Sequence, residues 1–263
     1  MTTNINFATA PGHQVLAAAG KKILRPGGKS ATEQLFTWAN FQPEETVLEL
    51  AASFGESAIQ IAKRFNVRVV GVEKNPDSVA RARENIQAAG LSDRVTIVEG
   101  DIFHLEQITD KFDYVLAEAI LTMQSNTGKA KVLSTIKDHL KPGGKFLSHE
   151  LLIRDKKSEV HKNLSQSIKV NANPLTASEW LIACQDAGLT LEQQQTGAMR
   201  LLNFGQIVRD EGLFRTFKIF WNVFTNPNLG QRFSEMRRNF QKYRHDIGYI
   251  VFWAKGTSLM DNG

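Results

Sequence analysis

Three carboxylates lie at the ends of three short apolar runs in the first half of the chain. Glu49 lies near the end of the first run, Glu73 directly follows the second, and Asp101 comes shortly after the third. One such carboxylate can accept both hydroxyls of a ribose, and another can accept from the amino group of an adenine. Ile102 or Phe103 is then expected against the face of the adenine ring. These residues together predict a pocket for an adenosine-like ligand.

A turn of small residues follows the first apolar run and precedes a helical pattern. Ala51, Ser53 and Gly55 let a ligand approach the backbone closely, and the amides at the start of the helix would face it. The turn therefore belongs to the same predicted pocket.

Candidate catalytic residues are predicted at the same edge of the molecule. Glu118 ends the fourth apolar run, and His149 ends the fifth together with Glu150. A histidine there can take a proton from an acceptor hydroxyl near neutral pH, although a buried, hydrogen-bonded histidine is the commoner case. Glu118 can hold a ligand or simply pair with a cation. Both interpretations stay open for each residue.

These residues need a fold that gathers the strand ends. Apolar runs separated by helical patterns predict parallel strands with right-handed crossovers, hence a doubly wound α/β sheet with helices on both faces. Before it, a helical segment is broken at residues 25–28 (Arg-Pro-Gly-Gly). The predicted strands are 46–50, 67–72, 95–98, 114–117, 145–152, 189–195 and 248–254, and the predicted helices include 57–65, 75–89, 129–140 and 178–187.

The order of these features resembles the class I S-adenosylmethionine-dependent methyltransferases. Residues 47–55 are similar to the family's acid-x-Gly-x-Gly-x-Gly loop, and Glu73 and Asp101 fall where the family has its ribose-binding and adenine-binding acids. Residues 112–115 resemble the family's fourth strand, and 140–144 the turn before its fifth. The resemblance implies a mostly parallel, seven-stranded Rossmann-like sheet, S-adenosylmethionine as cofactor and methyl transfer as the activity.

The resemblance covers about residues 40 to 153 well and the last two strands loosely. The helical spacing before residue 41 predicts an N-terminal helical cap over residues 1–40, and the resemblance implies a Rossmann-like methyltransferase domain over 41–263. A helical lid insertion is expected at about 200–245, before the last strand.

The resemblance also implies how the amino-acid part of the cofactor is held. Glu49 is expected to hold the methionine amino group, directly or through water. Arg25 is a cation available for the methionine carboxylate, although residues 25–28 can also be no more than a helix-breaking turn. The predicted cofactor-binding residues are Arg25, Gly28, Glu49, Ala51, Ser53, Gly55, Glu73, Asn75, Asp101, Ile102, Phe103 and Glu118.

The cofactor loop departs from the family pattern. Ala51 and Ser53 stand where two of the family's three glycines would be, and Gly55 alone remains. Each added Cβ disfavours positive φ and crowds a close contact. We expect a reshaped pocket with weaker or differently angled cofactor binding.

Residues 200–245 combine positive charge with apolar side chains at helical spacing. This segment has nine Lys or Arg against three acids, whereas the rest of the chain has 23 against 24. We expect an amphipathic helix that buries most of its apolar side chains against the core, while some rings line an acceptor pocket. The apolar side chains are Leu213, Phe214, Phe217, Phe220, Trp221 and Phe224.

The same segment suggests what the acceptor is. We expect a compact, apolar or aromatic small molecule with an anionic or strongly polar group, oriented by Arg200, Arg209 or Arg215. Basic residues interleaved with aromatic ones can also serve RNA or a membrane surface. Nucleic acid is disfavoured, because no nucleic-acid motif accompanies them.

Composition narrows the protein class. The chain has 263 residues, of which 42% are hydrophobic, and the single Cys184 excludes an internal disulfide or a multi-cysteine metal site. We predict a cytoplasmic protein with no signal peptide, no transmembrane span and no metal, and the sequence leaves its oligomeric state open.

Two rival functions stay open. An NAD-dependent oxidoreductase also needs an acid after its second strand, but the Gly-x-Gly-x-x-Gly pattern is missing. A non-catalytic S-adenosylmethionine-binding protein is favoured by the altered loop alone.

Overall fold

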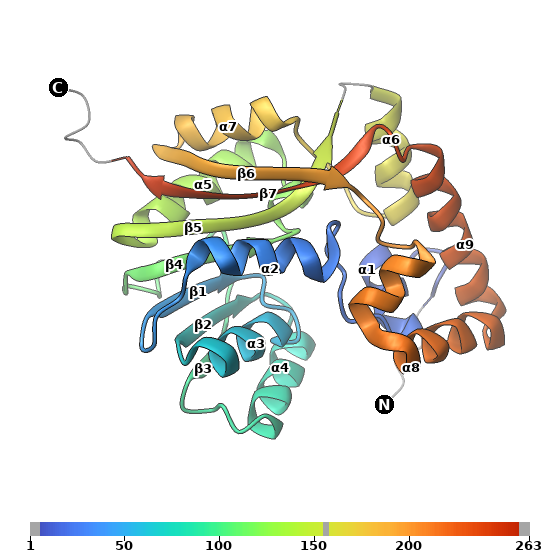
Figure 1. Cartoon of the computed structure of the whole chain (residues 1–263), viewed down its shortest axis with the longest axis horizontal. Helices are drawn as coiled ribbons and strands as arrows, with labels where there is room; N and C mark the ends of the chain where they lie inside the picture. The colour runs from blue at the N-terminus through green and yellow to red at the C-terminus, as the bar shows by residue number, and fades with distance from the viewer. Residues whose placement is uncertain (1–5, 155–157, 258–263) are drawn as a thin grey trace.

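A seven-stranded sheet forms the centre of the protein. The computed structural model describes residues 6–154 and 158–257. Residues 1–5 of the expected helical cap and residues 258–263 of the expected methyltransferase domain therefore lie outside the described residues. The strand order is β3-β2-β1-β4-β5-β7-β6, and β7 runs antiparallel to both of its neighbours (Figure 1). The strands are β1 (Thr46–Leu50), β2 (Arg68–Glu73), β3 (Val95–Glu99), β4 (Phe112–Glu118), β5 (Leu140–Ile153), β6 (Leu189–Ala198) and β7 (Ile247–Gly256). The predicted Rossmann-like fold is confirmed.

Helices cover both faces of this sheet (Figure 1). On one face, α2 (Gly28–Ala39), α3 (Glu56–Phe65) and α4 (Pro76–Ala88) pack in one apolar cluster with the strands. On the other, α5 (Asn126–His139) and α7 (Ala177–Asp186) pack in a second. The inner strands are buried on both sides, which explains why they are continuous apolar runs and not alternating ones.

A third apolar cluster lies beyond one end of the sheet. It joins α1 (Gly12–Ala19), α6 (Ser158–Ile168), α8 (Phe204–Thr225) and α9 (Pro227–Lys242), and the end of β5 reaches into it through Leu151 and Ile153. Figure 1 shows these four helices together at the right of the sheet, and we call them the end cluster. It combines the start of the chain with the segment before the last strand.

Two local expectations were wrong. β5 runs from Leu140 to Ile153, so His149 lies inside the strand, and the expected turn at 140–144 is an irregularity within it. The apolar side chains of α8 do not cover the core: Phe214, Phe217 and Phe224 are 88%, 71% and 85% exposed, and only Phe220 of this row is half-buried.

In the described part of the chain, no helix is long and apolar enough to cross a membrane. Among the same residues, no group of three or more His, Cys, Asp or Glu is placed to hold a metal ion.

Candidate active site

The parallel strands β1, β2, β3 and β4 end along one edge of the sheet, and the predicted acids lie there. Glu49 pairs in register with Gly71 of β2 and Leu116 of β4, while Glu73 and Glu118 end their strands. Edges of this kind are where doubly wound sheets bind ligands. The fold therefore gathers residues that are far apart in the sequence.

The turn after β1 keeps a glycine-like backbone without the glycines. Ala51 and Ser53 have φ of 55° and 51°, and Gly55 has φ of 74°. These left-handed values are the ones that glycine adopts most easily, so the two side chains are accommodated at a cost in backbone strain. The path of this loop is kept although its composition has changed.

Glu73 holds that turn in place. Its Oε2 accepts a hydrogen bond from the Ser53 amide at 2.8 Å, and its Oε1 accepts from the Asn75 amide at 2.9 Å. Asn75 in turn caps α4, because its side chain accepts from the Ser78 amide. The Glu73 carboxylate thus lies on the turn, with the carboxylate plane set by two backbone donors.

Asp101 is held next to the end of β3. Its Oδ1 accepts from the Phe103 amide at 3.0 Å, and its Oδ2 lies 2.8 Å from Lys74 Nζ. Ile102 is buried, and the Phe103 ring is half-buried. Burial opposes ionisation here, but Lys74 and the Phe103 amide outweigh it and lower the pKa of Asp101.

Glu49 is a buried carboxylate whose hydrogen bonds are incomplete. It is 5% exposed, and its Oε2 has no hydrogen-bond partner among the described residues. Burial raises its pKa to about 8, and the charge of Glu118 adds to this effect, while Arg25 opposes it. A buried polar atom without a partner costs free energy, so Glu49 is well suited to receive a cationic ligand group.

Glu118 is the centre of a hydrogen-bonded network. Its Oε2 lies 2.9 Å from Arg25 Nε and accepts from Ser57 Oγ at 3.0 Å, while its Oε1 accepts from Thr32 Oγ1 at 2.8 Å. Arg25 also donates to Ser57 and to Thr32. Although burial opposes ionisation, the charge of Arg25 and the hydrogen bond from Thr32 hold the pKa of Glu118 down at about 2. The carboxylate is therefore ionised throughout the physiological range.

His149 is fully buried behind Glu118. Its Nε2 accepts from the Gly27 amide at 3.0 Å, and its Nδ1 lies 3.3 Å from Thr32 Oγ1. Because Thr32 donates to Glu118, this pattern assigns a neutral ring with its proton on Nδ1. Burial lowers the pKa of His149 in agreement with that assignment. In this structure the basic nitrogen faces the loop backbone.

The neighbouring Glu150 fixes a different segment. Its carboxylate accepts from the amides of Leu121 and Thr122 and from Thr122 Oγ1, at 3.0, 2.9 and 2.6 Å. Burial raises its pKa to about 7 despite these donors. Glu150 thus holds the start of the segment after β4 against β5.

The loop that carries Arg25 is clamped by the first half of α8. Glu211 Oε1 accepts from the amides of Lys22 and Ile23 at 2.9 and 2.8 Å, and Asp210 Oδ1 accepts from the Lys29 amide at 2.9 Å. Buried Lys21 neutralises the two acids, its Nζ lying 3.4 Å from Glu211 and 3.8 Å from Asp210. The segment before the last strand therefore positions a residue of the network.

Gly28 lies at this clamp. Its φ is 65°, and a Cβ there would come within 2.6 Å of the Asp210 carboxylate. Its small size is thus needed for α8 to approach the loop.

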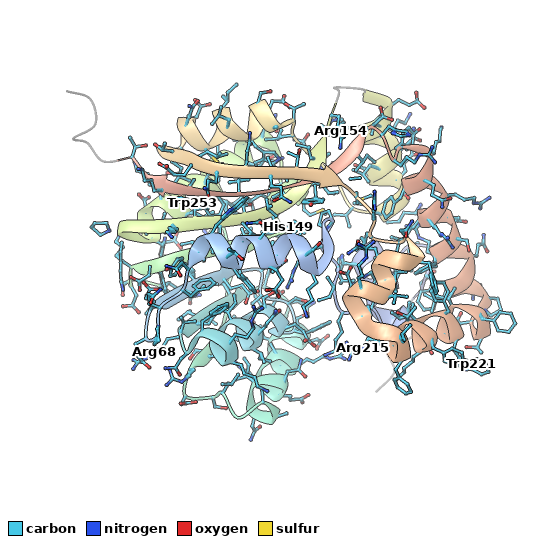
Figure 2. All side chains as sticks on the ribbon, viewed as in Figure 1. Arg68, His149, Arg154, Arg215, Trp221 and Trp253 are labelled. Atoms are coloured by element: carbon cyan, nitrogen blue, oxygen red, sulfur yellow. The ribbon has the colours of Figure 1, made fainter. Side chains whose placement is uncertain are left out.

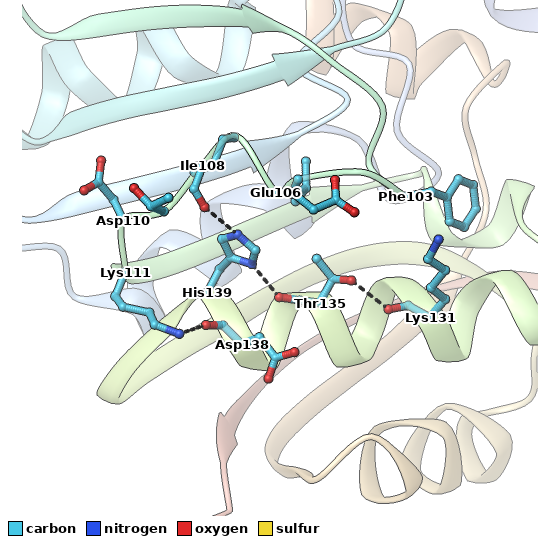
Figure 3. Close-up of a pocket in the computed structure, with 11 residues that line it drawn as sticks. Phe103, Glu106, Ile108, Asp110, Lys111, Lys131, Thr135, Asp138 and His139 are labelled. Carbon is cyan, nitrogen blue, oxygen red and sulfur yellow. Dashed lines mark hydrogen bonds between the residues drawn. The ribbon is translucent and has the colours of Figure 1, made fainter.

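A hollow of about 310 Å³ opens elsewhere, between α5 and residues 103–111 (Figure 3). His139 lies on its wall, with both ring nitrogens on backbone carbonyls of Thr135 and Ile108. Among the residues that line it, only Phe103 belongs to the predicted site. We therefore place the site by its strand ends and not by this hollow.

Thr32 and Ser57 were missed by the sequence reasoning. Both lie near the start of a helix, and they reach Glu118 across 86 and 61 residues of chain. A buried hydroxyl on the apolar face of a helix was the available signal. The structure places both in the network with Arg25, Glu118 and His149 (Figure 2 labels His149 at the centre of the molecule).

Comparison with known proteins agrees with this geometry. Residues 41–206 match a family described as a methyltransferase domain. An uncharacterized protein of Haemophilus influenzae is 34% identical over 241 residues, which are 91% of this chain and 96% of that protein. A sterol 24-C-methyltransferase of Aspergillus fumigatus is 28% identical over 186 residues, 68% of this chain but only 48% of that enzyme.

The fold also occurs in a solved structure with the cofactor product bound. A methyltransferase of Geobacter sulfurreducens in complex with S-adenosylhomocysteine superposes with a TM-score of 0.70 at 18% identity, covering 92% of this chain and 98% of that one. The orphaned Glu49 oxygen, the glycine-like turn and the strand-end acids fit such a cofactor. The chain belongs to the class I S-adenosylmethionine-dependent methyltransferases.

Proposed function

We propose that this methyltransferase acts on a small, apolar or aromatic organic acceptor that binds where β4 and β5 meet the end cluster. One observation carries the proposal: the loop that contacts Glu118 and His149 is held by α8, a helix of the end cluster, whose interior is apolar. Burial of apolar surface there contributes about 25 cal/mol per Å². The name of the Aspergillus relative gives it a sterol as acceptor, which is a compact apolar molecule.

The cofactor roles of the strand-end residues belong to the same proposal. Glu73 would hold the ribose hydroxyls, and Asp101 the adenine amino group, with Ile102 or Phe103 against the ring. Glu49 and Arg25 would hold the amino-acid part, and the turn from Ala51 to Gly55 would allow close approach. Two observations support these roles: Glu49 Oε2 is buried without a hydrogen-bond partner among the described residues, and two backbone amides orient the Glu73 carboxylate.

S-adenosylmethionine, when bound, supplies a methyl group that is already activated. The residues of this chain then have to align the acceptor, exclude water and take up a proton where the acceptor releases one. Glu118 keeps Arg25 oriented, and His149 is the candidate base. For that role the Gly27 amide has to leave His149 Nε2, so residues 25–28 must shift when the acceptor binds.

The test is to follow labelled methyl groups from S-adenosylmethionine into a panel of small aromatic and lipid-like acids, with RNA and a peptide mixture as comparison. We expect label in one or more small acids. Label in RNA or peptide alone would overturn the acceptor assignment.

His149→Gln, with Glu118→Gln as the second variant, tests whether His149 acts as the base or only holds the loop in position. A base at His149 predicts that the first variant loses the acidic limb of the pH–rate profile. An unchanged profile with raised KM would assign His149 to positioning the loop only.

A further inference from the structure

The second half of α8, residues 213–225, presents an apolar face to solvent. Leu213 and Trp221 are 77% and 58% exposed, and Phe214, Phe217, Trp221 and Phe224 follow one another on the same side at spacings of three, four and three. We call this set the α8 stripe: Leu213, Phe214, Phe217, Trp221 and Phe224. Figure 2 shows Trp221 at the outer edge of the molecule, away from His149.

The α8 stripe is not needed to hold the helix on the protein. The opposite side of α8 buries Thr216 and Ile219 in the end cluster, and Phe220 packs on Phe233 of α9 with ring centroids 6.3 Å apart. The helix is therefore apolar on two sides, and one side has no partner among the described residues. Contiguous exposed apolar side chains of this size mark a surface that meets something else.

The acidic side chains of α8 point into the protein, whereas its basic side chains are exposed to solvent. Its only acids, Asp210 and Glu211, point inward to Lys21 and to the amides of residues 22–29. Arg209 and Lys218 are exposed, and the side chain of Arg215 is 42% exposed although it pairs with Glu211. Seen from solvent, the α8 stripe is thus accompanied by Arg215 and Lys218 on its own half of α8 and by Arg209 on the half before Gly212, with no exposed acid on either half.

We propose that the α8 stripe docks on an anionic lipid bilayer, with its aromatic side chains in the interface and Arg209, Arg215 and Lys218 at the lipid headgroups. Helices with aromatic residues on one side and Lys or Arg beside them bind such interfaces, through apolar burial and attraction to anionic lipids. A symmetric dimer through the same face would bring these cations against their own copies, which is unfavourable.

The test is co-sedimentation of the full chain with vesicles of phosphatidylcholine containing 30% phosphatidylserine, and with vesicles of phosphatidylcholine alone. We expect binding to the anionic vesicles, at least about tenfold weaker partitioning to the neutral ones, and a fall of several-fold from 50 to 500 mM salt. Brominated lipid should quench Trp221, so Trp221→Phe should remove part of the quenching.

Two variants address the two parts of the surface. Phe214→Ser/Phe217→Ser should lower partitioning at least about tenfold, because two aromatic side chains no longer enter the interface. Arg209→Glu/Lys218→Glu should remove the preference for anionic lipid. Ile182→Ser, at an exposed apolar residue of α7, and Lys63→Glu, at an exposed cation of α3, are the matched controls and should bind normally.

All variants change exposed residues, so their melting temperatures and their response to S-adenosylhomocysteine should equal those of the wild type. Equal binding to neutral vesicles, or binding that both variants retain, would overturn the proposal. A dimer abolished by Phe214→Ser/Phe217→Ser, or RNA binding without vesicle binding, would overturn it in favour of another partner. No methyl acceptor is used, so failure here is distinct from failure of the proposed acceptor.

Discussion

The strained turn after β1 allows a direct test of the backbone argument. Ala51 and Ser53 have left-handed φ values, which a residue with a side chain adopts only at a cost in free energy. Replacing both by glycine, Ala51→Gly/Ser53→Gly, keeps the Ser53 amide that donates to Glu73. The change therefore removes the strain and leaves the hydrogen bond in place.

The expected gain is a difference between two terms. A left-handed conformation costs a residue with a side chain roughly 1–2 kcal/mol, while glycine loses about 0.5–1 kcal/mol more chain entropy on folding. With the middle of each range, about 1.5 and 0.75 kcal/mol, each substitution should raise the free energy of unfolding by about 0.75 kcal/mol, and the pair by about 1–2 kcal/mol. For a chain of this size that corresponds to a rise in Tm of roughly 2–8 °C.

Thermal unfolding followed by circular dichroism measures this shift. Ala52→Gly is the matched control, because Ala52 lies between the two positions, has negative φ and is 4% exposed. It should lower the free energy of unfolding by about 1–2 kcal/mol through the lost methyl group and the added entropy. A double variant no more stable than the wild type, beside a destabilised control, would refute the strain argument.

Three further outcomes concern the cofactor. S-adenosylhomocysteine at 100 times its Kd should stabilise the fold by about 2.7 kcal/mol in a thermal shift assay, and a larger shift with NAD would contradict the assigned cofactor class. Glu73→Ala should weaken its binding roughly 10–150-fold in calorimetry, whereas Glu99→Ala, paired in register on β3, should not. Glu49 is protonated at pH 7 because burial raises its pKa to about 8, and a cationic ligand group favours the carboxylate. Binding of S-adenosylhomocysteine should therefore release a proton at pH 7 and become tighter as the pH rises to about 8. Calorimetry in buffers of different ionisation enthalpy measures this proton release. If Glu49→Gln releases as many protons as the wild type, Glu49 does not have this role.

The strands were predictable because buried parallel strands are continuous apolar runs. β1 was predicted at its observed bounds, and β2, β3 and β4 differ by one or two residues at their ends. α6 was not predicted, because Val160, Leu164 and Ile168 are its only strongly apolar residues and their burial depends on α1 and α9. Such a helix is stabilised by tertiary packing more than by its own pattern.

Site residues that end a strand were predictable from the sequence. The contacts that distant segments make with them were not. Glu73 and Glu118 lie at strand ends as expected, and their roles stay predictions. The contacts of Arg25 with Glu118 and of Glu211 with residues 22–23 join distant segments that no local pattern links. The α8 stripe was misassigned for a similar reason: helical spacing shows that one side is apolar, but not whether that side meets the core or solvent.

α8 consists of two helices in series. We expect this break to limit how far local unfolding of one half spreads into the other. Gly212 has φ of 78° and ψ of 164°, so helical geometry stops there and resumes at residue 213. Because each helix must form its own nucleus, we expect residues 204–211 and 213–225 to fray separately, with the Arg215–Glu211 ion pair as a link across the break. The outer unit can exchange its amide hydrogens with solvent while Asp210 and Glu211 keep the Arg25 loop closed. Gly212 thus separates the helix that clamps the active-site loop from the helix that carries the α8 stripe.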